Sequence, residues 1–173
     1  MKSYFHVAAN MLGDGTVVMP GNYGRNLRCY STGPEGQKGN FYALARELIF
    51  EGIRVSEFES KPSRLHSCFM FECYEDARKY GRQVNEFGVI YEATIIDSAA
   101  KMHRGDFTLF QSRNLRNQSS FWELYERIAY EYWSNAPQHR VDGDGKVTML
   151  ESVEVAEIVT ESAIRLEGTA GYL

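Results

Sequence analysis

Cysteine and proline are scarce in this sequence of 173 residues, which contains three cysteines and four prolines. An odd number of cysteines without CxxC spacing argues against a disulfide framework and against a thiolate zinc site. Hydrophobic residues make up 43% of the chain and charged residues 24%. This balance excludes a disordered, collagenous or low-complexity protein and predicts a single globular domain over residues 1–173.

Long apolar runs and an excess of positive charge are also missing. The beginning of the chain has no hydrophobic stretch of the length that a signal-peptide core or a membrane span needs. We therefore expect a cytoplasmic protein with no membrane partner. Nineteen Lys and Arg residues against 23 Asp and Glu residues give a net charge of −4, so a site for a polyanion would have to be local.

Motifs of several common enzyme classes are absent. The glycine-rich stretch contains neither GxGxxG nor GxxxxGK[ST], which excludes the standard dinucleotide and P-loop phosphate sites. The GxSxG elbow of the α/β-hydrolases is missing too. The four histidines, at positions 6, 66, 103 and 139, show neither HExxH nor another metal-binding spacing, so no metal is expected.

One segment partly matches a calcium-binding loop. Residues 140–151 align with the twelve positions of an EF-hand loop, with Gly145 at the sixth position and Glu151 at the twelfth. The first position needs an acidic ligand but holds Arg140, and the residues after Glu151 alternate as in a strand. We therefore expect a glycine-rich hairpin turn here rather than a calcium site.

Hydrophobic periodicity predicts an α+β protein. Alternating or β-branched residues indicate strands at 4–8, 16–19, 65–71, 89–96, 153–160 and 163–166. Apolar residues at helical spacing indicate helices at 41–58, 75–83 and 121–134. Recurrent glycines predict a long loop at 20–40, and a polar connection is expected after the strand at 89–96. This irregular order favours α+β over a regular βαβ ladder.

Two of the predicted helices carry further signals. Ser120 followed by Glu123 fits a capping box at the start of the helix at 121–134. The helix at 41–58 has a weak point at Gly52 and one clear apolar face, which we expect to lie in the core. This face consists of Phe41, Leu44, Ala45, Leu48 and Ile49.

Several short motifs, taken in their order, resemble the ADP-ribosyltransferase superfamily. They are a histidine in the first strand, "IR…F…PSRL.S.F" from Ile53 to Phe69, "EDA" at 75–77, "YEATIID" at 91–97, "HRGD" at 103–106, "YW" at 132–133 and a late strand with a glutamate. The likeness runs over nearly the whole chain and is closest to a little-characterised bacterial and phage branch. It implies a fold with a split, mixed or antiparallel sheet and flanking helices that binds NAD in an extended cleft.

The resemblance implies roles for three residues. His6 would bond a ribose of NAD, since imidazole can both donate and accept a hydrogen bond. Phe69 stands where many relatives have a tyrosine that stacks on nicotinamide, and it keeps the flat face without the hydroxyl. Glu157 would bind the 2′-hydroxyl of the nicotinamide ribose and stabilise its oxocarbenium character. Glu151 and Glu154 lie nearby and remain alternatives for this carboxylate.

Three further residues are candidates for binding NAD. Arg64 follows Pro62 and Ser63 at a strand entry, and its guanidinium could clamp the pyrophosphate bidentately. Ser67 could contact a ribose, and Arg25 could reach a phosphate. Each residue also has a purely structural interpretation. Arg64 would form a salt bridge, Ser67 would be an ordinary strand hydroxyl, and Arg25 would be a solvated cation.

The resemblance thus predicts an enzyme that transfers ADP-ribose from NAD to a protein or nucleic-acid acceptor and releases nicotinamide. NAD would be consumed as a substrate. The alternative is a non-catalytic module for NAD binding or protein interaction on the same fold, in a bacterial or phage setting.

Overall fold

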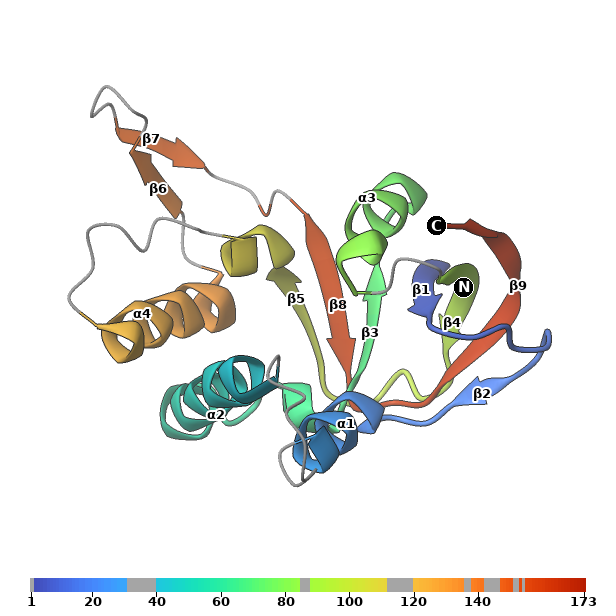
Figure 1. The fold of residues 1–173 in the computed structure, drawn as a ribbon, viewed down its shortest axis with the longest axis horizontal. Helices are drawn as coiled ribbons and strands as arrows, with labels where there is room; N and C mark the ends of the chain where they lie inside the picture. The colour runs from blue at the N-terminus through green and yellow to red at the C-terminus, as the bar shows by residue number, and fades with distance from the viewer. Residues whose placement is uncertain are drawn as a thin grey trace.

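The computed structural model describes residues 2–30, 40–84, 88–111, 120–135, 138–141, 147–150, 153 and 155–173. Its strands are β1 (Tyr4–Ala8), β2 (Val17–Val18), β3 (Cys68–Phe71), β4 (Val89–Ile95), β5 (Met102–Asp106), β6 (Gln138–Val141), β7 (Val147–Leu150), β8 (Ala156–Thr160) and β9 (Ile164–Tyr172). Its helices are α1 (Asn22–Tyr30), α2 (Asn40–Glu57), α3 (Tyr74–Val84) and α4 (Phe121–Ser134), with short 3-10 helices η1 (Arg64–His66) and η2 (Phe107–Gln111). Figure 1 shows their arrangement.

Seven strands form one sheet in the order β2-β9-β4-β1-β3-β8-β5. The predicted α+β class is therefore confirmed, and the strand pairs of the sheet are antiparallel rather than mixed. The order places segments from both ends of the chain side by side, so that β3 lies between β1 and β8. Phe71 of β3 is thereby paired with Phe5 on one side and with Glu157 on the other.

The sheet is curved, and the side chains on its concave face form a buried core. Sγ of Cys68 on β3 lies 3.5 Å from the carbonyl oxygen of Val18 on β2, although β1, β4 and β9 separate these two strands in the sheet. The sheet must therefore bend over this face, which brings its two halves together. Met70 in this core is fully buried. Burial of each such side chain stabilises the fold by about 1.5 to 3 kcal/mol.

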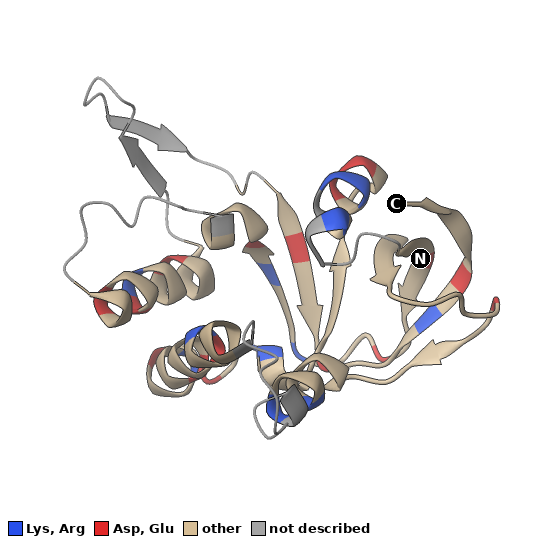
Figure 2. Ribbon diagram, in the orientation of Figure 1, with Lys and Arg blue, Asp and Glu red and all other residues tan. Residues whose placement is uncertain are grey.

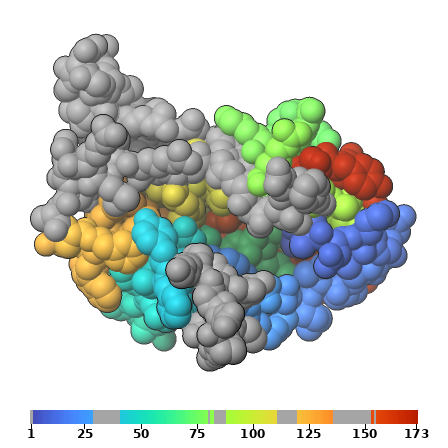
Figure 3. All heavy atoms as spheres, in the orientation of Figure 1, coloured from blue at the N-terminus to red at the C-terminus, as the bar shows by residue number. Residues whose placement is uncertain are grey.

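Helices cover the opposite face. Phe50 of α2 and Trp133 of α4 share a buried cluster with Val159 of β8. Ala77 of α3 packs with Phe71 of β3 in a separate cluster. In Figure 1 the helices α2 and α4 lie together on one side of the sheet strands β5 and β8, and α3 lies apart from them. The space-filling view shows the surface hollowed between α2, α3 and the N-terminal strands (Figure 3).

The predicted loop at 20–40 contains the helix α1, so this prediction is wrong for residues 22–30. The glycine in this helix allows the helix to pack closely against η1. Gly24 faces the backbone of η1, where a Cβ atom would lie 2.1 Å from the carbonyl oxygen of Leu65. Leu27 on the same helix is buried. Tertiary packing, rather than the residues' intrinsic propensity, stabilises this helix.

Two other boundaries differ from the predictions. The expected strand at 65–71 begins only at Cys68, because the residues before it form η1. The expected polar connection contains β5 and η2. The sequence of β5 gives no apolar alternation, because its buried positions are His103, Gly105 and Asp106, none of which is an apolar side chain. The strand predicted at 4–8 and the helix predicted at 121–134 have the same ends in the structure, and the other predicted strands and helices correspond to elements with different ends.

The predicted core face of α2 is only partly correct. Ile49 is buried, but Phe41 and Leu48 have exposed fractions of 61% and 55%. The helix instead buries Phe50 and the charged residue Glu47. A buried carboxylate is acceptable there because a cation from η1 is paired with it, which hydrophobic periodicity alone does not reveal.

The segment that resembles a calcium loop forms a hairpin at its described positions. β6 and β7 pair antiparallel, with Val141 opposite Val147, as the hairpin prediction requires. The connecting residues and Glu151 lie outside the described residues. Within the described residues, no group of three or more His, Cys, Asp or Glu side chains could hold a metal ion. None of the helices described there has the length and apolarity needed to span a membrane.

Alanine substitutions at two glycines test the packing of the helices, because one glycine is in close contact with a neighbour and the other is not. A Cβ atom at Gly105 would lie 2.2 Å from Cε2 of Tyr132, whereas one at Gly52 would have no atom within 4 Å. We expect Gly105→Ala to lower the free energy of unfolding by about 1 to 3 kcal/mol through steric overlap. We expect Gly52→Ala to raise it by about 0.5 to 1 kcal/mol, because alanine is the better helix former. Urea denaturation measures both, and a neutral Gly105→Ala would contradict the packing described.

Candidate functional site

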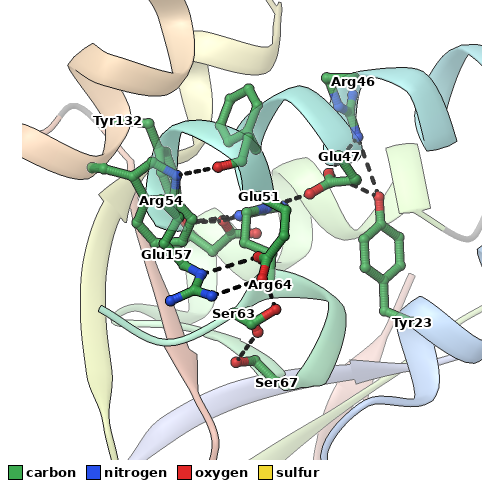
Figure 4. A network of polar contacts seen from close by, with 12 residues as sticks. Tyr23, Arg46, Glu47, Glu51, Arg54, Ser63, Arg64, Ser67, Tyr132 and Glu157 are labelled. Carbon is green, nitrogen blue, oxygen red and sulfur yellow. Dashed lines mark hydrogen bonds and ion pairs between the residues drawn. The ribbon is translucent and has the colours of Figure 1, made fainter. Parts of the chain in front are cut away.

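Arg64 lies at the centre of a buried polar network that joins η1, α2, α4 and β8 (Figure 4). Its Nε donates a hydrogen bond to Oε2 of Glu47 at 2.9 Å. Its Nη1 donates to Oε2 of Glu157 at 2.5 Å and to the hydroxyl of Tyr132 at 2.7 Å. The partners of Arg64 lie up to 93 positions away from it in the sequence. The guanidinium therefore connects elements that are far apart in the sequence.

Aromatic rings surround this cation. The guanidinium carbon lies 4.9 Å from the ring centroid of Phe69, 4.5 Å from that of Phe110 and 5.1 Å from that of Tyr132. Each such contact attracts a cation electrostatically, and together the rings exclude water from its ion pairs. Arg64 itself is only 5% exposed. The ion pairs are thus formed in a setting of low dielectric, where charges interact more strongly than in water.

The register of the sheet places Glu157 on the same face as the ring of Phe69. Phe71 pairs with Glu157 and Phe69 with Val159, and paired residues direct their side chains to one face. Glu157 is the single acidic residue of the otherwise uncharged strand β8 (Figure 2). On its other side it faces Gly105, whose missing side chain leaves room for the ring of Tyr132.

The protonation states in the network follow from burial and from pairing. Burial raises the pKa of the Glu47 carboxyl, but Arg64 and Arg46 outweigh it and hold this pKa below its ordinary value. Burial raises the pKa of Tyr132 well above its ordinary value, so its hydroxyl keeps its proton and donates it to Oε2 of Glu157 at 2.9 Å. Both bonds to Glu157 end on Oε2. Its Oε1 accepts none from the described residues.

His6 lies on the other face of the sheet. The pairing of Phe5 with Phe71 directs the neighbouring His6 away from the face of Glu157. Nδ1 of His6 lies 2.8 Å from the carbonyl oxygen of Phe69, which can only accept, so Nδ1 carries the proton. Burial lowers the pKa of His6, although this hydrogen bond opposes the change. The imidazole is therefore neutral near pH 7 and bridges β1 and β3.

The remaining predicted residues are separate from the Arg64 network. The buried hydroxyl of Ser67 donates to the carbonyl oxygen of Ser63 at 2.7 Å and closes the turn around η1. Arg25 is exposed on α1, with Nη2 3.5 Å from Oδ1 of Asn22. Glu151 and Glu154 lie outside the described residues. The structure thus brings together three of the predicted site residues, Arg64, Phe69 and Glu157.

Sequence reasoning did not identify four members of the network. Glu47 and Arg46 lie on α2, Tyr132 on α4 and Tyr23 on α1, where the tyrosine hydroxyl lies between the two α2 side chains. A signal was available for Glu47, because it lies at helical spacing from the apolar residues Ala43 and Phe50. A carboxylate on the apolar side of a helix indicates a buried cation elsewhere in the chain.

A model of one protein family matches residues 27–161, which is most of the chain. The chain belongs to the DUF2441 family, described as a protein of unknown function. The part that defines the family includes Glu47, Arg64, Phe69, Tyr132 and Glu157 and begins after Tyr23 and Arg25. It also excludes His6. Comparison with curated proteins gives no match.

The Arg64 network makes a prediction about stability. Arg64→Met leaves Glu157 buried without a cation among the described residues and leaves Glu47 with Arg46 as its remaining cation. We expect this to cost about 3 to 5 kcal/mol of unfolding free energy at pH 7. Glu157→Gln leaves Arg64 paired with Glu47 and should cost less. Urea denaturation of both variants measures the difference. Equal losses would show that Glu47 does not compensate the charge of Arg64.

A second prediction concerns His103 of β5, beside this network. Its Nε2 donates to the carbonyl oxygen of Tyr132 at 2.9 Å, and its Nδ1 is buried with no hydrogen-bond partner among the described residues. Burial lowers the pKa of His103 from 6.5 to about 4. As the pH falls from 6.5 towards 4, the unfolded chain therefore gains a proton that the native imidazole does not, and stability is lost.

This depression of the His103 pKa corresponds to about 2 kcal/mol of unfolding free energy between pH 7 and pH 5. His103→Gln keeps a donor for the Tyr132 carbonyl but does not titrate. We expect the loss of stability between these pH values to be smaller by about this amount in the variant. Urea denaturation at both pH values gives the comparison, and parallel behaviour of the two proteins would contradict a neutral buried His103.

Proposed function

We propose that this chain binds NAD and transfers ADP-ribose to a protein or nucleic-acid acceptor, with release of nicotinamide. Two lines support the proposal: the ordered motifs that resemble the ADP-ribosyltransferase superfamily, and the grouping of Arg64, Phe69 and Glu157, which that resemblance selected. The observation that carries it is the fixed carboxylate of Glu157 on the same sheet face as the ring of Phe69.

The chemistry of Glu157 suits this reaction. When the bond between ribose C1′ and the nicotinamide nitrogen breaks, its electron pair leaves with nicotinamide and positive charge develops on the ribose. A carboxylate that is already oriented stabilises this charge without reorganisation. Arg64 and Tyr132 hold Oε2 of Glu157, and Oε1 is left to accept from the ribose 2′-hydroxyl. The acceptor nucleophile then bonds to C1′ and releases its proton.

Phe69 and His6 have supporting roles in this proposal. The ring of Phe69 is partly buried, with the Arg64 guanidinium over one face and a T-shaped contact with Tyr23 at 5.2 Å between centroids. In this proposal a remaining part of its flat surface stacks on nicotinamide. His6 fixes the strand that carries Phe69 through the Phe69 carbonyl oxygen. In this arrangement His6 acts on the ring's position from the opposite face of the sheet.

A specific observation favours the second candidate, a non-catalytic module for NAD binding or protein interaction. Arg64 is buried and already paired with two carboxylates, Glu47 and Glu157. A cation in this state stabilises the fold without a ligand. In this alternative the same network is a structural element, and the protein does not consume NAD.

The test incubates the protein with NAD and follows nicotinamide release by mass spectrometry, with and without cell lysate as a source of acceptors. Glu157→Gln keeps the size of the side chain and removes its charge. We expect turnover to fall by about two to three orders of magnitude, the effect of losing one electrostatic stabiliser of about 3 to 4 kcal/mol, with little change in NAD affinity.

The matched control is Glu167→Gln, which neutralises an exposed glutamate on β9 bonded to Thr94. It should turn over NAD at the rate of the parent. Circular dichroism and thermal melting check that Glu157→Gln is folded. Unchanged turnover in folded Glu157→Gln would overturn the role of this carboxylate, and a parent protein that binds NAD without consuming it would favour the non-catalytic module.

A further inference from the structure

Arg46 of α2 is held in place at the edge of the Arg64 network (Figure 4). Its Nη2 donates to Oε1 of Glu47 at 3.0 Å and to the hydroxyl of Tyr23 at 3.2 Å. Its guanidinium carbon lies 4.9 Å from the ring centroid of Phe110. These contacts fix the plane of the guanidinium. Its side chain nevertheless keeps 18% of its surface exposed.

Most of the N–H donors of Arg46 have no acceptor among the described residues. A guanidinium has five N–H groups in a rigid fork, and those on Nη2 are the ones that bond to the described residues. Nε of Arg46 is buried and has no hydrogen-bond partner among the described residues. Leaving a buried donor of a charged group unpaired is costly, so an unpaired native donor calls for an explanation. The N–H groups of Nη1 also have no partner among the described residues, and Nη1 is not one of the buried unpaired atoms, so a ligand oxygen can reach them.

Arg64 is not equally available to a ligand. Its Nε and Nη1 bond to two carboxylates and a tyrosine hydroxyl, and it is only 5% exposed. Arg46 shares a single carboxylate, Glu47, with Arg64. Of these two neighbouring arginines, Arg46 is the one with both an accessible surface and an unpaired donor. The phosphate-binding role that the sequence suggested for Arg64 therefore fits Arg46 better.

We propose that Arg46 binds the diphosphate group of a nucleotide whose ribose lies at Glu157. This inference rests on the proposed function and assigns a phosphate-binding residue to it. Successive ion pairs connect Arg46 to Glu47, Glu47 to Arg64 and Arg64 to Glu157. Arg46 and Glu157 are therefore close to each other but separated by two side chains. A ribose and the phosphate attached to it are likewise adjacent units of a nucleotide. The fork of Arg46 can bond two phosphate oxygens at once.

The test measures binding by calorimetry with three probes: NAD, ADP and nicotinamide riboside, which lacks the phosphates. Arg46→Gln removes the charge and should raise the Kd for NAD and for ADP about tenfold or more, with no change for nicotinamide riboside. Arg46→Lys keeps the charge without the fork, and we expect a smaller increase. The control, Arg127→Gln, removes an exposed charge on α4 and should bind all three probes like the parent.

The outcomes separate this inference from the proposed function. If Arg46→Gln and Arg46→Lys both bind ADP and NAD like a parent that consumes NAD, the inference is wrong and the proposed function stands. If ADP binding depends on Arg46 but the parent does not consume NAD, the inference stands and the transferase proposal fails. A parent that binds neither NAD nor ADP overturns both. Thermal melting without ligand shows whether Arg46→Gln is folded, and Arg46→Lys decides if it is not.

Discussion

The buried guanidinium of Arg64 is the interaction on which the arrangement of this molecule depends. A charge removed from water is tolerated only where opposite charges and hydrogen bonds replace its hydration. Glu47 and Glu157 supply the charges, and Tyr132 supplies a further hydrogen bond. Because these partners belong to α2, β8 and α4, satisfying one cation fixes the positions of two helices against the sheet.

Glycines at two positions of close packing make this arrangement sterically possible. Gly105 gives the ring of Tyr132 the space to reach Glu157, and Gly24 lets α1 approach η1, which carries Arg64. The bent sheet buries its other face independently of this network, through a wholly apolar cluster that includes Met70 and Ile164. The fold thus has one apolar core within the sheet and a second interface with its helices, where charge and packing are combined.

The same features are consistent with two uses of the network. Rigid partners that keep Glu157 in one orientation stabilise the native state, and they also preorganise a carboxylate for chemistry. Arg64 is buried and paired with two carboxylates, whereas Arg46 at the edge of the network has one carboxylate partner and keeps part of its side chain exposed. The difference between the two arginines lies in their partners and burial, since both are cations of the same kind.

The sequence by itself determined the local elements whose signal is local. Alternation predicted the strand at Tyr4–Ala8, and the capping box predicted the start of α4, where Oγ of Ser120 accepts from the amide of Glu123. The resemblance to the ADP-ribosyltransferase superfamily also selected Arg64, Phe69 and Glu157, which the structure brings together. Only the tertiary structure decided that a glycine-containing segment forms α1, that α2 buries Glu47 and exposes Leu48, and that His6 faces away from Glu157. The physical reason is that each of these depends on a partner far away in the chain. The partner of α1 is the Leu65 carbonyl, that of Glu47 is the Arg64 guanidinium, and the direction of His6 follows from the register of β1 with β3. The periodicity of the sequence carries no information about such partners.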